Sequence, residues 1–419
     1  KKPFVNQFSL RDFKTNFLAT KNFNIKSILL FLINNFFKIF GGKKNKYFIY
    51  KTYLGLFREL ILCARLGQVP FFDEIVLKFK RPNLSKKLRN SSFLNLKEKN
   101  KFEKFVYEIF LDHMPIAFLE KFSQLENSVN KNRNLPEMPE KIYSAMCLWE
   151  NSSINYYCAL KKEKNTKILY SQHGGTYGIN KVHFQTKYEL EIADKFLSYG
   201  WNTGNKKIIK FGNIHNLNKR NFNSSKKYLL FVSNKRHKYE TFLDSDSSWR
   251  INFINTVKFY LKFLFNLPND IKKSTLIRIL PNTNLYDLDF FNNIKNNFKI
   301  ENSKNIFKLY KSSKLIIHSI NSTSLLETFY LNIPSIIILN KDYQFNKLGK
   351  KVFNDLKKNN IFFDNPIVAS KFIKKIWNNG IDDWWFSNQV QRSVNKFNLT
   401  YSKKRTNVIS DLVKLLKNK

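Results

Sequence analysis

The residue best placed to do chemistry is His173, which follows an apolar run at 168–170 and precedes a glycine-rich stretch. Such a run predicts a strand whose carboxyl end opens into a tight loop. Ligands of open α/β sheets bind outside the carboxyl ends of the strands, where an imidazole can exchange protons near neutral pH. Glycines lack a Cβ atom and let backbone N–H groups approach a ligand. The residues of this candidate loop are Gln172, His173, Gly174, Gly175, Tyr177 and Gly178. The alternative is a plain turn with a surface histidine, and we favour the functional interpretation.

A second group of polar residues follows the apolar run at 314–318 and opens a predicted helix. It contains Asn321, Ser322, Thr323 and, one turn later, Glu327. A helix N-terminus offers free N–H donors and a partial positive charge, which suit a phosphate. The Glu327 carboxylate could accept hydrogen bonds from ribose hydroxyls. An ordinary capping box explains the same pattern, and the residues alone do not decide between the two.

Two arginines offer positive charge near these groups. Arg278 lies within an apolar run that ends in a proline, and burying it is costly without an anionic partner. Its candidate partners are Asp287, Asp289, Glu327 and a ligand phosphate. Arg236 lies in a basic loop at 233–237, after the first strand of the second half, for which a simply solvated loop is the alternative.

Other common sites have no signature in the sequence. We find no phosphate-binding GxxxxGK[ST] loop, no GxGxxG fingerprint and no nucleophile elbow. The histidines without metal-ligand spacing are His113, His183, His215 and His237. We place His318, which ends an apolar run, in the core. We therefore expect no metal ligands and no resident cofactor.

Alternating strands and helices must position these residues. The predicted strands cover residues 142–148, 168–172, 195–199, 207–211, 228–232, 275–280, 314–318 and 335–339. The predicted helices cover residues 47–66, 102–122, 154–162, 251–265, 285–293, 324–331, 346–357, 368–377 and 384–416. Such alternation is typical of βαβ units on a parallel sheet, so we expect an α/β fold.

The length of 419 residues suggests two domains. The chain turns polar around 216–226, so we predict domains over 1–215 and 216–390, followed by a helix over 391–419 that packs back across them. The apolar stretch 28–40 is too short to span a membrane, which takes about 20 residues. We interpret it as a core helix of the N-terminal lead-in, with a membrane-interface helix as the alternative.

The net charge of +42 invites a nucleic-acid interpretation. The lysines are scattered along the whole chain, however, and accompany many Asn, Ile, Phe and Tyr residues, which AT-rich codons encode. We favour an anionic substrate or an anionic membrane surface. Three unpaired cysteines in apolar contexts (Cys63, Cys147 and Cys158), without a signal peptide at the start, indicate a cytoplasmic protein.

Together these motifs resemble a family of transferases from bacterial surface-carbohydrate loci. The resemblance is carried by QHGGTYG at 172–178, by Glu189, Glu191 and Asp194, by Tyr199–Trp201, by Arg278 with Pro281, and by Ser322, Thr323 and Glu327. Residues Tyr53, Leu54 and 66–70 extend it to the first half of the chain. Tyr199 stands where the family usually has tryptophan, and the spacing to Glu327 has one extra residue.

The resemblance implies a GT-B-type glycosyltransferase with two Rossmann-like domains facing each other across a cleft. It implies a nucleotide-sugar donor, with CMP-linked acidic sugars slightly favoured, held in the second domain. Ser322 and Thr323 would bind phosphate, Glu327 ribose, and Arg236 and Arg278 negative charge, with Asn321 also among the donor-binding residues. His173 would act as general base toward a glycan or glycoprotein acceptor on the first domain, with Glu189 or Glu191 as substitutes. The alternatives are a CDP-alditol transferase or a sugar-nucleotide epimerase on the same scaffold, and a non-enzymatic nucleic-acid binder.

Overall fold

The computed structural model describes residues 40–72, 84–89, 100–146, 151–215, 217, 226–233, 253–279, 294, 297–302 and 305–418. The chain forms two compact units. Unit 1 comprises Lys1–Tyr50, Cys63–Glu140 and Trp149–Thr166, and unit 2 comprises Lys51–Leu62, Lys141–Leu148 and Lys167–Lys419. Several predicted features lie outside the described residues, namely 28–39, Cys147, Arg236, His237, Pro281, the carboxylates Asp287 and Asp289, and the helix at 285–293.

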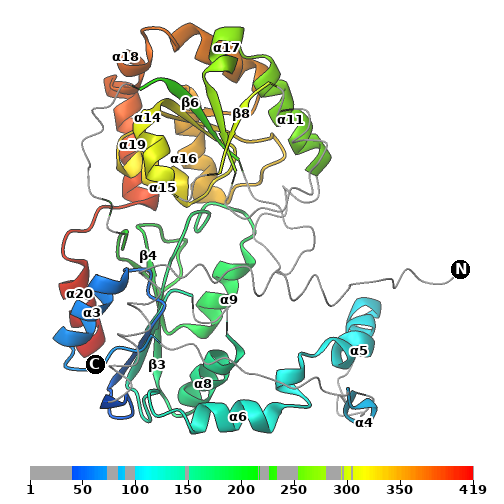
Figure 1. Cartoon of the computed structure of the whole chain (residues 1–419), viewed down its shortest axis with the longest axis vertical. Coiled ribbons are helices and arrows are strands. Elements are labelled where there is room, and N and C mark those ends of the chain that lie inside the picture. The colour runs from blue at the N-terminus through cyan, green and yellow to red at the C-terminus, as the bar shows by residue number, and fades with distance from the viewer. Residues whose placement is uncertain are drawn as a thin grey trace, which may run out of the picture. The chain divides into compact units, whose positions relative to one another are not determined.

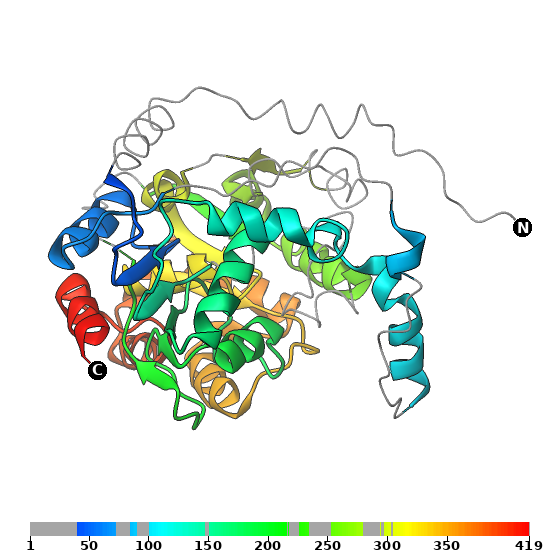
Figure 2. The same cartoon turned by 90° about the horizontal axis from the view of Figure 1, so that it is seen from below.

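Unit 1 is mainly helical, and its helices at 101–130 are drawn in cyan (Figures 1 and 2). Its elements are β1 (Tyr47–Tyr50), α4 (Lys86–Arg89), α5 (Lys101–His113), η1 (Ile116–Phe118), α6 (Phe122–Asn130) and α8 (Ser152–Glu163). Phe48 packs edge-on against Phe71 and Tyr157, with ring centroids 5.3 and 4.9 Å apart. Helix α3 (Leu56–Arg65) runs from unit 2 into unit 1.

Two predicted helices of the first half are wrong in extent. The helix predicted at 102–122 stops at His113, because Pro115 disfavours helical geometry at Met114, whose φ and ψ are −61° and 128°. The helix predicted at 47–66 begins only at Leu56. Its first residues form β1 instead, where aromatic and β-branched side chains favour a strand, and Gly55 at φ 84° separates the two elements.

The first sheet of unit 2 is parallel. Its strands are β2 (Lys141–Ser144), β3 (Lys167–Ser171), β4 (Lys195–Ser198) and β5 (Ile208–Lys210), neighbours in that order. Leu169 pairs with Lys195, and Phe196 pairs with Ile208. Helix α9 (Phe184–Ile192) connects β3 to β4. The glycine-rich loop therefore leaves the carboxyl end of a central strand, as predicted.

The second sheet of unit 2 is also parallel and has six strands. They are β6 (Tyr228–Val232), β7 (Thr275–Arg278), β8 (Lys299–Glu301), β9 (Ser313–His318), β10 (Ser335–Ile338) and β11 (Phe362–Phe363). Their order, β8-β7-β6-β9-β10-β11, is the doubly wound order of dinucleotide-binding folds. The α/β class with two parallel sheets is thus confirmed. In such a sheet the order reverses between the first and fourth strands, here β6 and β9, and ligands bind at that point.

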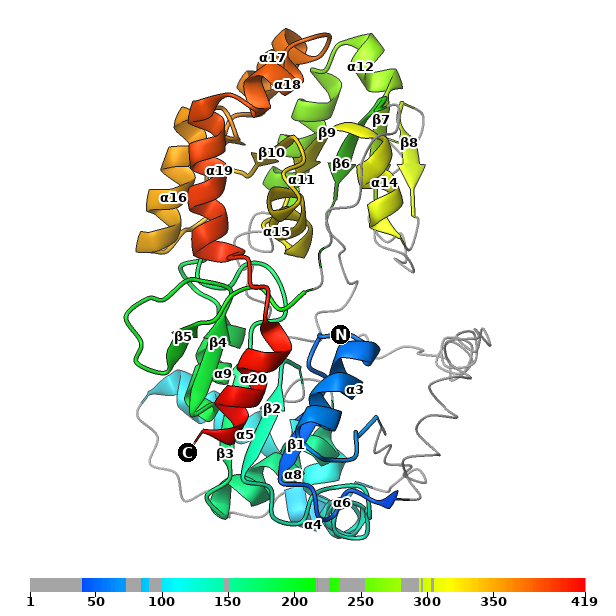
Figure 3. The ribbon, with the colours of Figure 1, turned by 90° about the vertical axis from the view of Figure 1, so that its left-hand side faces the viewer.

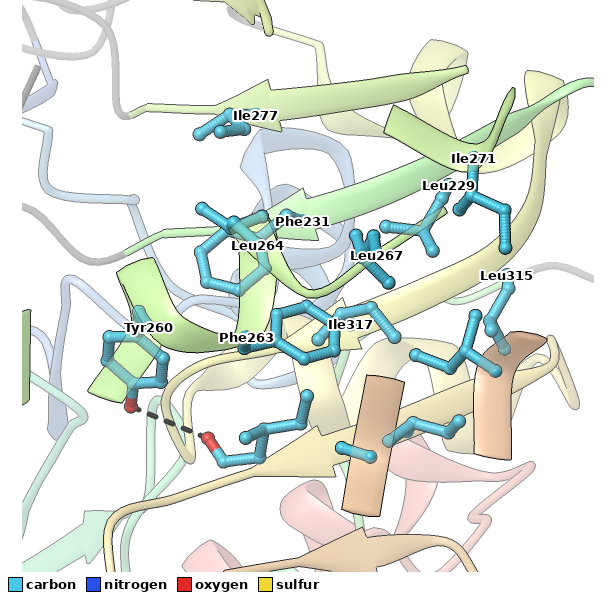
Figure 4. Packing of buried hydrophobic residues seen from close by; sticks show 14 of the residues in the cluster. Leu229, Phe231, Tyr260, Phe263, Leu264, Leu267, Ile271, Ile277, Leu315 and Ile317 are labelled. Carbon is cyan, nitrogen blue, oxygen red and sulfur yellow. Dashed lines mark hydrogen bonds between the residues drawn. The ribbon is translucent and has the colours of Figure 1, made fainter. Parts of the chain in front are cut away.

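Helices cover both faces of this second sheet (Figure 1). They are α11 (Phe253–Phe265), α12 (Asn269–Lys273), α14 (Ile306–Ser312), α15 (Thr323–Tyr330), α16 (Lys347–Lys358) and α17 (Pro366–Ile376). Helix α11 places Tyr260 and Phe263 against Phe231 of β6, with centroids 5.8 and 6.0 Å apart (Figure 4). Ile277 and Ile317, both fully buried, continue this core across the neighbouring strands.

The last part of the chain is helical but interrupted. It forms α18 (Ile381–Trp385), α19 (Asn388–Tyr401) and α20 (Val408–Lys417) rather than one helix over 384–416. Helix α19 lies along α15 and α16 (Figure 3). After it, the Lys403 N–H donates to the Tyr199 carbonyl beyond β4 at 2.8 Å. Within the described residues, no helix is both long and apolar enough to cross a membrane.

Candidate active site

Gln172 fixes the start of the loop that follows β3. Its side chain is 1% exposed and accepts hydrogen bonds from the Tyr199 N–H at 3.0 Å and from the Trp201 indole at 2.7 Å. Its amide donates to the Gly174 carbonyl at 2.7 Å. All three partners lie in the segments that directly follow β3 and β4. Gln172 therefore holds the loop in shape and joins the carboxyl ends of β3 and β4.

The glycines of this loop allow close contact with other parts of unit 2. A Cβ atom on Gly175 would lie 2.3 Å from the carbonyl carbon of Ser322. Gly178 has φ 72°, and a Cβ atom there would lie 2.4 Å from the Trp201 ring. We expected the glycines to clear space for a ligand. At Gly175 that space is occupied by backbone at the start of α15, so the two predicted motifs are in contact.

Gly175 also forms a polar contact with the start of α15. Its N–H donates to the Thr323 hydroxyl at 3.3 Å. The loop and the helix start are 148 residues apart in the chain. The structure thus brings the His173 loop beside the predicted phosphate-binding residues.

His173 belongs to a chain of hydrogen bonds that ends at a buried carboxylate. The Tyr177 hydroxyl donates to Glu189 Oε1 at 3.0 Å, and the Tyr177 hydroxyl oxygen also lies 3.0 Å from Nδ1 of His173. A phenol has one proton. If that proton points to Glu189, the hydrogen between Tyr177 and His173 must come from Nδ1, and Nε2 keeps its lone pair. Gln185 Nε2, an amide donor, lies 3.3 Å from His173 Nε2 and fits this tautomer.

Burial controls the protonation of this chain. Loss of solvation lowers the pKa of His173 to about 4, against a smaller opposing effect of the Ala145 backbone, and the neighbouring His215 lowers it further. Burial and the Glu189 carboxylate raise the pKa of Tyr177 well above its usual range. At neutral pH the imidazole is therefore neutral and the phenol keeps its proton. Such an imidazole can accept a proton from a bound hydroxyl group.

The two carboxylates expected as substitute bases lie in different surroundings. Glu189 is fully buried on α9 behind Tyr177. Glu191 is exposed on the same helix, and its backbone carbonyl accepts from Lys207 Nζ at 3.2 Å. In this arrangement Glu189 contacts the imidazole only through Tyr177.

The start of α15 lies at the carboxyl end of β9. Ser322 is the N-cap residue, but within the described part of the chain its side chain makes no capping bond. Its hydroxyl instead lies 2.8 Å from that of Ser324. The capping box considered as an alternative is thus not formed. His318 is fully buried, as expected, and its Nε2 lies 2.9 Å from the Thr328 hydroxyl.

Asn321 precedes this helix start and is fully buried. Neither its Oδ1 nor its Nδ2 has a hydrogen-bond partner among the residues that the structure describes. Leaving a buried amide without partners costs about 1–3 kcal/mol. Asn321 lies one residue before the N-cap of α15, so its amide has the chemistry to bond a polar ligand at this helix start.

Glu327 and Arg278 lie close together behind the helix start. The Tyr310 hydroxyl donates to Glu327 Oε2 at 2.9 Å. Burial raises the pKa of Glu327, while Tyr310 and the charge of Arg278 oppose that rise. Arg278 is 6% exposed, and burial lowers its pKa. Within the described ranges its Nε has no hydrogen-bond partner. Glu327 is thus the predicted partner that the structure places within electrostatic range of Arg278.

Sequence reasoning gave no site role to three further groups, of which Tyr53 and His215 lie beside His173. The Tyr53 ring lies 5.4 Å from the His173 ring and 6.2 Å from that of His215. His215 Nε2 lies 3.4 Å from the His173 carbonyl oxygen. Glu59 is 8% exposed, accepts from the Thr52 hydroxyl at 2.6 Å, and has its pKa raised to about 7 by burial. The signal that could have identified Glu59 is its place as a lone carboxylate within the apolar helix stretch at 56–65.

Other candidate sites are weaker. No group of three or more metal-ligating side chains occurs among the described residues. A pocket of about 340 Å³ lies elsewhere in unit 2. It is lined by Gly200, Trp201, Asn202, Lys210, Leu348, Leu399, Thr400 and Lys403. It contains none of the predicted site residues.

Comparison with known proteins finds a family model described as LIC12162 family transferase, which matches residues 1–416. No curated protein matches the chain. Among solved structures, the chain is similar to MurG of Acinetobacter baumannii, with 10% identity, coverage of 89% of this chain and 99% of that one, and a TM-score of 0.41. It is similar to the wall teichoic acid polymerase TagF, with 11% identity, 98% coverage of both chains and a TM-score of 0.40. It is also similar to the spinosyn rhamnosyltransferase SpnG, with 9% identity, coverage of 71% and 77%, and a TM-score of 0.38.

Proposed function

The chain belongs to the LIC12162 family of transferases, and we propose that it is a GT-B-type glycosyltransferase that uses a nucleotide-sugar donor. The acceptor is a cell-surface glycan or glycoprotein, and the resemblance of the motifs favours a CMP-linked acidic sugar as donor. The observation that carries this proposal is the buried Asn321, whose amide has no hydrogen-bond partner among the described residues, beside the N-terminus of α15 at the order reversal of the second sheet. We further propose the domains 1–215 and 216–390 as acceptor and donor sides.

The donor phosphates would bind at the start of α15. The free N–H groups of its first turn and the Asn321 amide can donate to phosphate oxygens. Arg278 supplies a buried positive charge, and Arg236 would add another. Glu327, in the second turn of α15, would accept hydrogen bonds from the ribose while it also accepts one from the Tyr310 hydroxyl. The Thr323 hydroxyl would likewise bond the phosphate while it accepts a hydrogen bond from the Gly175 N–H.

The acceptor hydroxyl would be activated by His173. Its oxygen attacks the anomeric carbon, the bond from that carbon to the phosphate oxygen breaks, and the hydroxyl proton passes to His173 Nε2. The acceptor hydroxyl would take the place of the Gln185 amide at Nε2. Tyr177 and Glu189 hold Nδ1 and stabilise the imidazolium that forms. The helix N-terminus and Arg278 stabilise the charge on the departing nucleotide. This route uses side chains and helix dipoles only, and we propose that no resident metal or cofactor takes part.

The site of action would be the cytoplasmic face of the membrane. The charge of +42 suits an anionic membrane surface, and a peripheral position would bring the enzyme to lipid-linked or surface-bound acceptors. Nucleic acid remains an outcome to be tested rather than a proposed partner.

Thermal unfolding in the presence of CMP, CDP, UDP and GDP tests the donor site. We expect one of these nucleotides to raise the unfolding temperature of the wild type. Asn321→Ala should lose that rise while its unfolding temperature without nucleotide stays equal or increases, because a buried unsatisfied amide is removed. Asn340→Ala, in the turn after β10, is the matched control. The proposal fails if no nucleotide stabilises the wild type or if Asn321→Ala responds normally.

A donor-side comparison separates the related activities. A CDP-alditol transferase would be stabilised by CDP-glycerol or CDP-ribitol rather than by nucleotide sugars. An epimerase would convert its nucleotide sugar without any acceptor.

A further inference from the structure

The turn at Lys51–Gly55 has an unusual backbone. Lys51, Tyr53 and Gly55 have φ values of 45°, 61° and 84°. Only glycine adopts this left-handed region at little cost, and a bulky aromatic residue there is uncommon. Glycine or asparagine would fit position 53 better than tyrosine does. Outliers of this kind concentrate at functional sites.

The residues on either side of Tyr53 hold the turn in place. Thr52 is fully buried, and its hydroxyl donates to Glu59 at 2.6 Å and accepts from the Leu54 N–H at 3.3 Å. The Ala145 N–H donates to the Lys51 carbonyl at 3.1 Å, just beyond β2. Both flanks are therefore fixed by bonds that do not involve the Tyr53 side chain.

Packing does not explain the tyrosine. Its side chain is 45% exposed. Its ring meets His173 at 5.4 Å and His215 at 6.2 Å, and His215 in turn meets Tyr199 at 5.7 Å. The turn thus presents a half-exposed aromatic face beside the His173 imidazole.

We propose that Tyr53 is the platform on which the sugar ring of the acceptor rests beside His173. The apolar C–H face of a pyranose matches a flat aromatic ring, and the phenol and the His215 imidazole can bond its hydroxyls. Tyr53 lies beside His173, the proposed base, whereas the groups proposed to bind the donor lie on β7, after β9 and on α15. We therefore assign the Tyr53 ring to the acceptor. This inference rests on the proposed function and specifies the acceptor site as one for a pyranose.

Saturation-transfer nuclear magnetic resonance on the full chain tests this inference, with methyl glucoside, methyl galactoside and methyl N-acetylglucosaminide as probes. We expect at least one probe to bind the wild type and Tyr53→Phe. Tyr53→Gly should bind it about tenfold more weakly, which corresponds to about 1.4 kcal/mol. Phe57→Ala removes a side chain that is 75% exposed on the adjacent helix and should bind like the wild type.

Thermal unfolding of the same variants separates a binding role from a structural one. Tyr53→Gly relieves the left-handed backbone, so its unfolding temperature should stay within about 3 °C of the wild type. A larger decrease would overturn the inference, as would equal probe binding by Tyr53→Gly or no binding by the wild type. Nucleotide-induced stabilisation is measured in parallel. If nucleotide-induced stabilisation persists while the expected sugar binding is not seen, only the role of Tyr53 is rejected. If the wild type shows no nucleotide-induced stabilisation, the donor site is rejected instead.

Discussion

At the scale of single residues, the site depends on how one phenol proton is shared. Tyr177 bonds both Glu189 and His173, so the carboxylate influences the imidazole without touching it. His173, Tyr177 and Glu189 therefore have separate roles in the site. The sequence alone showed only a glycine-rich loop and an acidic stretch. It also allows the base to be tested apart from the groups that position it.

His173→Ala should reduce turnover by about 10²–10⁴-fold, the usual contribution of general-base assistance. Nucleotide affinity should stay near that of the wild type, because the imidazole contacts the acceptor oxygen. Turnover and nucleotide affinity are measured on the same variant, with His113→Ala, an exposed histidine of α5, as control. Weakened nucleotide binding would identify His173 as a phosphate ligand, and unchanged turnover would refute the catalytic role.

Tyr177→Phe and Glu189→Gln should each lower kcat with little change in the KM for donor. Both changes keep the shape of the side chain. Tyr177→Phe removes the bond that holds Nδ1, and Glu189→Gln removes the charged acceptor of the Tyr177 hydroxyl. Because the two residues act through one chain of hydrogen bonds, the double variant should lose no more than the larger single effect. A double-mutant cycle on kcat, with its pH profile, measures this. Simple additivity of the two losses would show that no such chain operates.

At the scale of elements, the sequence predicted most strands of both sheets but missed β1 and the short strands β8 and β11. It placed the helix ends of the first half poorly. Apolar β-branched runs such as 314–318 identify buried strands, because few other residues fit between two layers of helices. Pro115 was visible, but the periodicity on both sides of it suggested one helix. The segment at 47–50 shows that a short apolar run does not distinguish strand from helix.

The residues of the candidate site likewise divide into those that the sequence could predict and those that it could not. His173, Tyr177, Asn321 and Ser322 could be predicted because each follows a recognisable strand. The contact between Gly175 and Ser322 could not be predicted, since it joins residues nearly 150 positions apart. The sequence offers Tyr53 only as part of the family resemblance, because the role that we propose for it depends on a backbone angle that tyrosine rarely adopts.

Gly175→Ala should destabilise the protein by about 1–3 kcal/mol, the usual cost of overpacking. Its Cβ atom would lie 2.3 Å from a backbone carbon of Ser322, and backbone cannot move aside as a flexible side chain can. Gly380→Ala is the control, because the nearest atom to its Cβ would be 3.4 Å away, at the edge of ordinary contact. Urea unfolding of both variants measures the difference, and equal stability would contradict the close contact.

At the scale of the whole molecule, buried titratable groups make stability depend on pH in two directions. The pKa of Glu59 is raised from 4.5 to about 7, so its contribution is present below pH 4.5 and is lost as pH rises through 7. The pKa of His318 is lowered from 6.5 to about 3, so its contribution is present above pH 6.5 and is lost as pH falls toward 3. The two effects oppose each other in the range between.

Glu59→Gln separates them, because glutamine keeps the shape and cannot ionise. Relative to the wild type, its free energy of unfolding should increase between pH 4.5 and pH 8 by on the order of 3 kcal/mol at most. Urea unfolding at both pH values gives this difference. Glu163→Gln, at an exposed position of α8, is the control and should show no such trend. A pH-independent difference for Glu59→Gln would mean that the buried carboxyl does not titrate in this range.

The positive charge of the chain leads to a prediction about surfaces. We expect the protein to sediment with phosphatidylglycerol vesicles and not with phosphatidylcholine vesicles, and to dissociate as salt rises, because exposed charges are screened. Binding to random single-stranded and duplex oligonucleotides is measured alongside. Strong preference for one nucleic-acid sequence at physiological salt would contradict the membrane interpretation.

The end of α19 reaches back to the His173 loop. The Tyr401 hydroxyl donates to the Gly178 carbonyl across 223 residues of sequence, and the Ser402 hydroxyl donates to the Leu326 carbonyl. A ribosome that adds about 5–20 residues per second needs roughly 10–45 s to make the intervening chain. During that time the loop is already synthesised but lacks this partner. Translation pauses before residue 401 would therefore prolong exposure of an incomplete site to chaperones and proteases.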